Sequence, residues 1–171
     1  DLLEGRAAWI PALALVGEGE ERSVLVWGYG VLDQDGLCGW ITGDAARGLE
    51  LACGYPGSEL LELEQGTVRL RSVTLDCIPV LEGEVVTELR LDLRLTGQVE
   101  ELLGDTSKLQ MQVEERTLRY LRAAVEQAQQ ENRDFLGLNM LAGLSAPEVC
   151  DQIRVQWPER FAELEIDIQC K

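Results

Sequence analysis

The stretch that most constrains the fold runs over residues 107–132. Its apolar residues recur every three to five positions, with charged residues between them, which predicts a helix with one buried face. The helix would be roughly 39 Å long at about 1.5 Å per residue, close to the diameter of a compact chain of this size. We therefore expect one long helix that crosses the whole domain. Its apolar stripe consists of Leu109, Val113, Leu118, Leu121, Val125 and Ala128.

The segment before this helix predicts what the helix covers. From Glu88 to Leu95, charged residues and leucines alternate without interruption, so all the leucines point to one face of a β-strand. A sheet with one apolar face needs a cover, and the long helix supplies it. The expected fold class is α+β, with an antiparallel-rich (mixed) β-sheet and one long and two or three shorter helices packed on it.

Shorter strands are expected on both sides of this unit. Pro11 marks the first strand as an edge strand or as irregular at its start, and Asp35-Gly36 favours a tight turn over a calcium loop. A change of parity along the chain predicts a β-bulge near Arg71-Ser72. The expected strands cover residues 7–16, 23–31, 37–41, 60–64, 67–78, 84–99 and 164–168.

The shorter helices have recognisable start signals. Asp44 is available as the N-cap of a helix that ends before Gly54, and residues 135–144 suggest a short helix or a buried turn. Ser145-Ala146-Pro147-Glu148 resembles a capping box that opens a further helix, which Pro158 would end.

The charge and composition exclude several functional classes. A formal net charge of −16 argues against nucleic acid and anionic lipid as partners, since both attract clusters of Lys and Arg. No His is present, which removes the commonest general base and metal ligand. Five cysteines without a CxxC pair do not fit a zinc site. We expect buried free thiols at Cys53 and Cys77, and a disulfide framework is the lesser alternative. We expect no metal and no cofactor.

Length predicts a single domain over residues 1–171, and the opening Asp1 suggests a piece of a longer protein. Four stretches carry further information: Gly39-Trp40-Ile41-Thr42-Gly43-Asp44-Ala45-Ala46-Arg47-Gly48-Leu49, residues 91–99 ending in Leu95-Thr96-Gly97, the turn Asp134-Phe135-Leu136-Gly137, and residues 157–166 beginning Trp157-Pro158. In this order they resemble the C-terminal domain of the Ger(x)C (GerAC-like) spore germination lipoproteins, the C subunit of nutrient germinant receptors. The resemblance covers about residues 23–170. The family's turn is Asp-x-Phe-Gly, so here the aromatic residue comes one position early.

This resemblance implies a noncatalytic subunit domain that acts in spore germination by docking onto other proteins. The implied partners are the integral membrane A and B subunits of the receptor. Family members sit at the outer face of the spore inner membrane through an N-terminal lipid anchor. None of the cysteines here can be that anchor by position, so the anchor would lie upstream and this fragment is expected to be soluble. The motif residues that the resemblance marks, with structural roles expected, are Gly39, Asp44, Arg47, Gly48, Asp134, Phe135, Gly137 and Trp157.

Two alternatives stay open at this point. A germinant-binding module could line a pocket with tryptophans, although packing in the core is the favoured use of Trp9, Trp27, Trp40 and Trp157. A carboxylate-based hydrolase would need two facing acids, whereas Glu88 and Asp92 on an alternating strand favour a solvated face. A docking domain should instead show an exposed apolar patch or an uncovered strand edge. We expect Asp134 to cap its turn, so that Asp134→Ala costs about 1 kcal/mol of stability.

Overall fold

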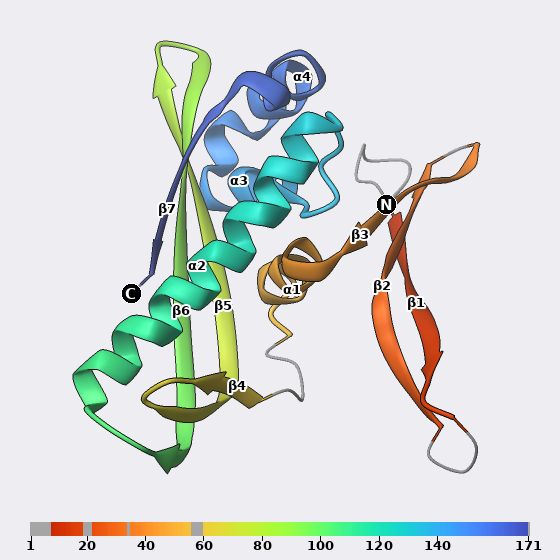
Figure 1. Ribbon diagram of the computed structural model, residues 1–171. Helices are drawn as coiled ribbons and strands as arrows, with labels where there is room; N and C mark the ends of the chain where they lie inside the picture. The colour runs from red at the N-terminus through yellow and green to blue at the C-terminus, as the bar shows by residue number, and fades with distance from the viewer. Residues whose placement is uncertain (1–7, 19–21, 34, 56–59, 171) are drawn as a thin grey trace.

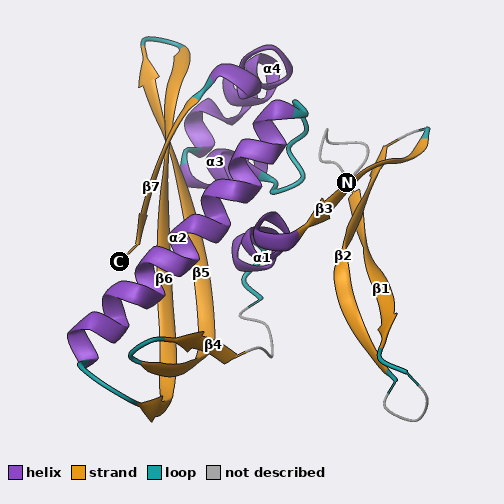
Figure 2. Ribbon diagram, in the orientation of Figure 1, coloured by secondary structure: helices purple, strands orange, loops and turns teal. Residues whose placement is uncertain are grey.

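The computed structural model describes residues 8–18, 22–33, 35–55 and 60–170, and it confirms the α+β class (Figures 1 and 2). The strands are β1 (Ala8–Val16), β2 (Ser23–Asp33), β3 (Gly36–Thr42), β4 (Leu60–Leu63), β5 (Gly66–Glu82), β6 (Val85–Leu102) and β7 (Glu165–Cys170). The α-helices are α1 (Gly43–Ala52), α2 (Thr106–Gln130), α3 (Leu138–Ser145) and α4 (Cys150–Arg160). Two 3₁₀ turns, η3 (Pro147–Val149) and η4 (Phe161–Glu163), flank α4.

The strands divide between two sheets, whereas the sequence suggested one. β1, β2 and β3 form an antiparallel sheet, and the second sheet has the order β4-β5-β6-β7, in which only the β6–β7 pair is parallel. α1 joins the two sheets, while the β1–β2 hairpin extends away from the rest of the domain (Figure 1). With the strands divided in this way, many apolar side chains of the three-stranded sheet stay exposed.

The core lies between α2 and the four-stranded sheet, as the sequence predicted. α2 crosses this sheet diagonally (Figure 1). Leu89, Leu91 and Leu93 of β6 are fully buried, and Leu121 of α2 is buried with them in one hydrophobic cluster. Val113 and Leu118 of the predicted stripe are half-buried. Thr117, which the sequence did not single out, is fully buried and donates its hydroxyl to the Val113 carbonyl at 2.9 Å.

The irregularities predicted in the strands are confirmed. The β5–β6 register shifts between Leu70 and Ser72, which leaves Arg71 as the extra residue of a bulge. β1 is an edge strand, which agrees with its proline at Pro11. The turn between β2 and β3 is closed by the Asp33 carboxylate, which accepts the Asp35 backbone N–H at 2.9 Å.

Three predictions about helix ends are wrong. Thr42 is the N-cap residue of α1, because Gly43 already takes the first helical position and Asp44 lies inside the first turn. The capping box fails because Ser145 is the last residue of α3, so its hydroxyl is not at an N-cap. Pro158 lies inside α4, which continues to Arg160. A proline this close to the end removes only one backbone hydrogen bond. No described helix combines the length and the apolar character that a membrane span requires.

Candidate functional site

The turn after α2 is built around a buried aspartate. Asp134 accepts the backbone N–H groups of Leu138 and Asn139, each at 2.8 Å, one on each carboxylate oxygen. Gly137 has φ 74°, which a side chain disfavours, and Phe135 is fully buried. Both carboxylate oxygens are therefore engaged in starting α3, which is the capping role that the sequence predicted for Asp134.

The motif around α1 is a helix contact rather than a site for chemistry. A Cβ on Gly48 would lie 2.1 Å from the Tyr120 carbonyl oxygen and 2.7 Å from the Ala124 Cβ, both on α2. Only glycine permits this approach. Arg47 pairs with Glu50 at 3.0 Å, and Glu50 also accepts the Tyr29 hydroxyl at 2.7 Å. Burial, and then the bond to Glu50, raise the pKa of Tyr29 well above its usual value.

Asp44 faces α2 from the start of α1. Its Oδ2 lies 2.9 Å from Nε of Arg119, with both side chains about half exposed. Exposed pairs of this kind contribute less than about 1 kcal/mol. Asp44 is therefore a surface link between α1 and α2.

Side chains from the last turn of α2 and from the residues after it cover the outer edge of β3. The Gln127 amide donates to the Trp40 carbonyl at 2.8 Å, and Arg133 donates to the Cys38 carbonyl at 3.4 Å. A Cβ on Gly39 would lie 3.4 Å from the Glu131 carboxylate, an ordinary contact. This edge of the three-stranded sheet is thus closed, and β1 forms the opposite edge.

The structure separates the motif residues into two groups. Gly39, Asp44, Arg47 and Gly48 lie around α1, while Asp134, Phe135, Gly137 and Trp157 lie beyond the end of α2. Trp157 is buried and stacks on Phe161 with ring centroids 5.2 Å apart. The contacts of these residues are packing, capping and exposed ion pairs, and they do not converge on one cavity.

Acidic and thiol side chains give no sign of a catalytic or metal centre in the part of the chain that the structure describes. Glu88 pairs with Arg90 at 2.9 Å on the surface of β6. No described cluster of three or more His, Cys, Asp or Glu could hold a metal ion. No disulfide joins any of the five cysteines in the described residues, and Cys77 is fully buried while Cys53 is half-buried.

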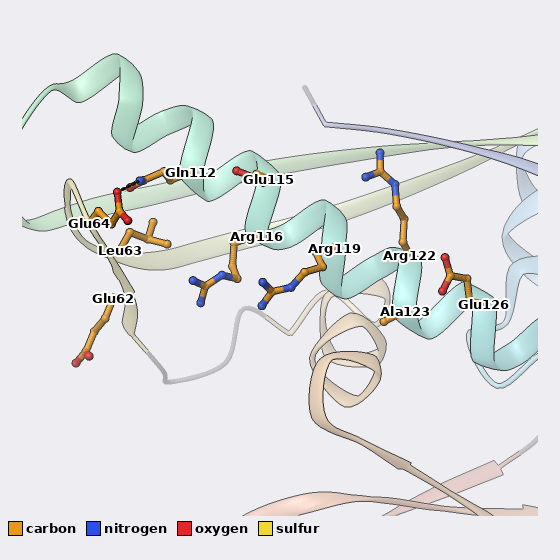
Figure 3. A pocket seen from close by; sticks show the side chains of 10 residues that line it. All are labelled: Glu62, Leu63, Glu64, Gln112, Glu115, Arg116, Arg119, Arg122, Ala123 and Glu126. Carbon is orange, nitrogen blue, oxygen red and sulfur yellow. Dashed lines mark hydrogen bonds between the residues drawn. The ribbon is translucent and has the colours of Figure 1, made fainter.

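A groove of about 940 Å³ runs between β4 and α2. Figure 3 shows Arg116 and Arg119 turned toward the same space, with Glu62 directed away from α2. The lining carries three arginines and four glutamates: Arg116, Arg119, Arg122, Glu62, Glu64, Glu115 and Glu126. Such an open groove of mixed charge differs from the enclosed, mainly apolar pocket typical of small-molecule sites.

The three-stranded sheet carries a large exposed apolar surface. Large apolar residues of β1, β2 and β3 lie outside the core, and each is 38–66% exposed. We call this set of residues the apolar sheet surface. Trp27 and Trp40, expected in the core, belong to it and touch each other edge to face at 5.7 Å. Its members are Ile10, Leu13, Leu15, Val16, Val24, Leu25, Val26, Trp27, Leu37 and Trp40.

The sequence carries a local signal for this surface. Residues 23–27 are almost continuously apolar, so both faces of this part of β2 carry apolar side chains. A two-stranded hairpin with apolar residues on both faces is marginal in water. The described part of the chain leaves these residues without a cover.

Comparison with known proteins identifies the family. The family described as "Spore germination B3/ GerAC like, C-terminal" matches residues 27–171. The chain belongs to this family. The resemblance stated from the sequence is therefore confirmed, and spore germination is the process to which this germinant receptor family is assigned. No curated protein matches the chain.

A solved structure supports the fold of this GerAC-like domain. The crystal structure of the GerBC protein aligns with 99% of this chain at a TM-score of 0.74 and 18% sequence identity. The aligned region is 57% of the GerBC chain, so this chain spans a little over half the length of that protein. At this level of identity the likeness shows a shared fold.

Proposed function

We propose that this GerAC-like domain is a noncatalytic subunit domain of a spore nutrient germinant receptor and acts by protein–protein docking. Its partners in this proposal are the integral membrane A and B subunits at the outer face of the spore inner membrane. The domain would belong to a longer lipoprotein whose upstream part carries the lipid anchor. The motif residues serve the fold in this proposal and touch no substrate.

The observation that carries the proposal is the apolar sheet surface. Single exposed apolar side chains are common on soluble proteins, whereas exposed apolar side chains gathered on one small sheet mark an interaction site. Ile10, Leu37 and Trp40 gather over Gly30, where a Cβ would lie 2.8 Å from Leu37 and 3.4 Å from Trp40. Because Gly30 has no side chain, these three apolar side chains pack directly onto the strand. A protein partner could place apolar groups there and exclude water from both sides.

The test is capture of receptor subunits from spore membranes. The domain with its upstream part restored is used as bait at low and at moderate salt, beside the double variant Ile10→Ser/Trp40→Ser. The control is Leu144→Ser/Val155→Ser, which removes even more exposed apolar groups from α3 and α4. We expect wild type and control to capture multispanning subunits and the sheet variant to lose most of the capture, with all three melting cooperatively.

Capture at moderate salt and a calorimetric test for nutrient binding distinguish the docking proposal from its alternatives. Loss of capture at moderate salt would indicate that the acidic surface takes part, because screening weakens interactions between exposed charges. Equal capture by the sheet variant would refute docking through this surface. Absence of capture, combined with tight binding of a nutrient in calorimetry, would instead favour the germinant-binding alternative, and the groove beside α2 would then be examined first.

A further inference from the structure

One arginine in the groove between β4 and α2 has no partner. Arg116 is half-buried, and in the described part of the chain it has neither a hydrogen bond nor an ion pair. The chain has 31 acidic and 15 basic side chains, so carboxylates are plentiful. Taking a charged group partly out of water without a partner costs free energy. The unpaired guanidinium group is therefore not explained by a contribution to the fold.

Acidic side chains around the groove are engaged with other residues or turned away. Asp44 pairs with Arg119 at 2.9 Å, and Glu64 accepts the Gln112 amide at 3.5 Å. Glu62 is directed away from α2 in Figure 3. Among the residues that the structure describes, none of these carboxylates neutralises the unpaired guanidinium group.

Arg116 lies where two hollows meet, with a second arginine beside it. It lines the groove of about 940 Å³ and also a hollow of about 750 Å³ between β4 and the first turn of α1. Arg119 follows about 4.5 Å further along the helix axis, and Figure 3 shows both side chains turned toward the same space. The Arg119 guanidinium carbon lies 5.5 Å from the centre of the Tyr120 ring. Two planar guanidinium groups thus face one space, and such groups match the geometry of carboxylates.

The shape and charge of the groove favour a polypeptide over a small molecule. The groove is open and runs along α2, whereas small-molecule sites are enclosed and mainly apolar. Arginine clusters are a recurring means of recognising acidic segments of polypeptides. Glutamates from both walls surround the two arginines, so a segment with basic residues on each side of its acidic ones is complementary to the groove. These glutamates are Glu62 and Glu64 of β4 and Glu115 and Glu126 of α2.

We propose that Arg116, together with Arg119, binds two neighbouring acidic residues in an extended segment of a partner polypeptide that lies in this groove. The segment carries the two Asp or Glu residues at its centre and a Lys or Arg on each side. Contact charges decide this recognition, because at physiological ionic strength charges more than about 8 Å away are largely screened. The groove and the apolar sheet surface belong to different elements, and neither proposal depends on the other.

The test uses the 171-residue chain and a synthetic peptide, without any receptor. The peptide is acetylated and amidated and has the sequence Lys-Thr-Ser-Glu-Ser-Glu-Ser-Thr-Lys. Its control replaces both glutamates with glutamine and is therefore more positive. Long-range attraction to a chain of net charge −16 favours the control, so tighter binding of the glutamate peptide reports local contacts.

NMR titration of the arginine Nε–H signals measures both affinities. We expect the glutamate peptide to bind at least about fivefold more tightly than the control at low salt. The signal of Arg116 should shift, which locates the site on the wild-type chain alone. The difference between the peptides should shrink as salt is added, because screening weakens contacts between charges at a surface.

Matched variants test the role of the unpaired guanidinium group. Arg116→Gln should abolish the preference for the glutamate peptide, and Arg116→Lys should keep part of it, because lysine retains the charge without the planar fork. Arg154→Gln is the control on α4, where the side chain is 67% exposed, and should leave the preference unchanged. Arg116→Gln should also melt like the wild type, since it removes no ion pair of the described structure.

Several results would overturn the proposal. These are equal binding of the two peptides, tighter binding of the control, and a full preference retained by Arg116→Gln. Absence of binding by either peptide at millimolar concentration would count equally against it. A clearly lower melting temperature of Arg116→Gln would show that this arginine has a partner within the fold in solution, and would assign it a structural role instead.

Discussion

Gly48 of α1 lies against the main chain of α2, so closely that a Cβ there would lie 2.1 Å from the Tyr120 carbonyl oxygen. Backbone atoms cannot move aside as the end of a flexible side chain can. The contact holds α1, the link between the two sheets, directly on the helix that covers the core. This contact explains why the Arg-Gly-Leu sequence of α1 has a glycine at its centre.

Gly48→Ala should therefore lower the free energy of unfolding by about 1–3 kcal/mol, the usual cost of overpacking. In an unhindered helix the same change would be stabilising, so the sign of the effect is informative. Chemical denaturation measures it. Gly143→Ala is the control, because its Cβ would meet the Cys150 Sγ at 2.8 Å, and a thiol side chain can rotate away. A more stable Gly48→Ala protein would contradict the contact.

Asp134→Ala should be more costly than an exposed cap, at about 2–3 kcal/mol, because it leaves two N–H groups at the start of α3 without their acceptor. Asp134→Asn keeps one acceptor oxygen and should lose less. Thermal melts compare both with Asp151→Ala, whose side chain is 90% exposed. A loss below that of the Asp151 control would show that the capping bonds are not formed in solution.

Asp44→Ala should change stability by less than about 0.5 kcal/mol, because the pair with Arg119 is exposed to water. An N-cap at Asp44 would instead cost about 1 kcal/mol when removed. A double-mutant cycle with Arg119→Ala separates the ion pair from other effects. The coupling should shrink further in high salt. A coupling above 1 kcal/mol that persists in salt would be inconsistent with an exposed pair.

The buried thiol of Cys77 makes stability fall at alkaline pH. Burial, with a smaller effect of the nearby Asp134, raises the pKa of Cys77 to about 12 from 9.0. Below pH 9 the thiol is protonated in both states and contributes no pH dependence. Between pH 9 and about pH 12 the unfolded chain loses the thiol proton and the folded chain keeps it. The free energy of unfolding therefore decreases by up to about 1.4 kcal/mol per pH unit.

Comparison with Cys77→Ala isolates this contribution from the other groups that titrate in the same range. Unfolding measured between pH 8 and pH 11 should show a shallower decline for the variant. Parallel curves for the two proteins would mean that the folded state ionises Cys77 as readily as the unfolded chain. The exposed Cys150 serves as a reference in thiol labelling, where it should react well before Cys77.

Local periodicity accounts for the parts of the fold that the sequence predicted. Alternating leucines set the buried face of β6, the apolar stripe set the face of α2, and the change of parity at Arg71 located the bulge. These features depend on residues near one another in the chain. Asp134 and Gly137 belong to the same class, because a capped turn is closed by its own neighbours.

Sequence alone determined the α+β class, the long helix over a leucine-lined strand and the family resemblance. Only the tertiary structure decided the division into two sheets, the exposure of Trp27 and Trp40, and the parallel pairing of β7 with β6. The physical reason is that periodicity identifies which side chains prefer to leave water, but not which surface covers them. Asp44 illustrates this limit, since its partner Arg119 lies on another helix far along the chain.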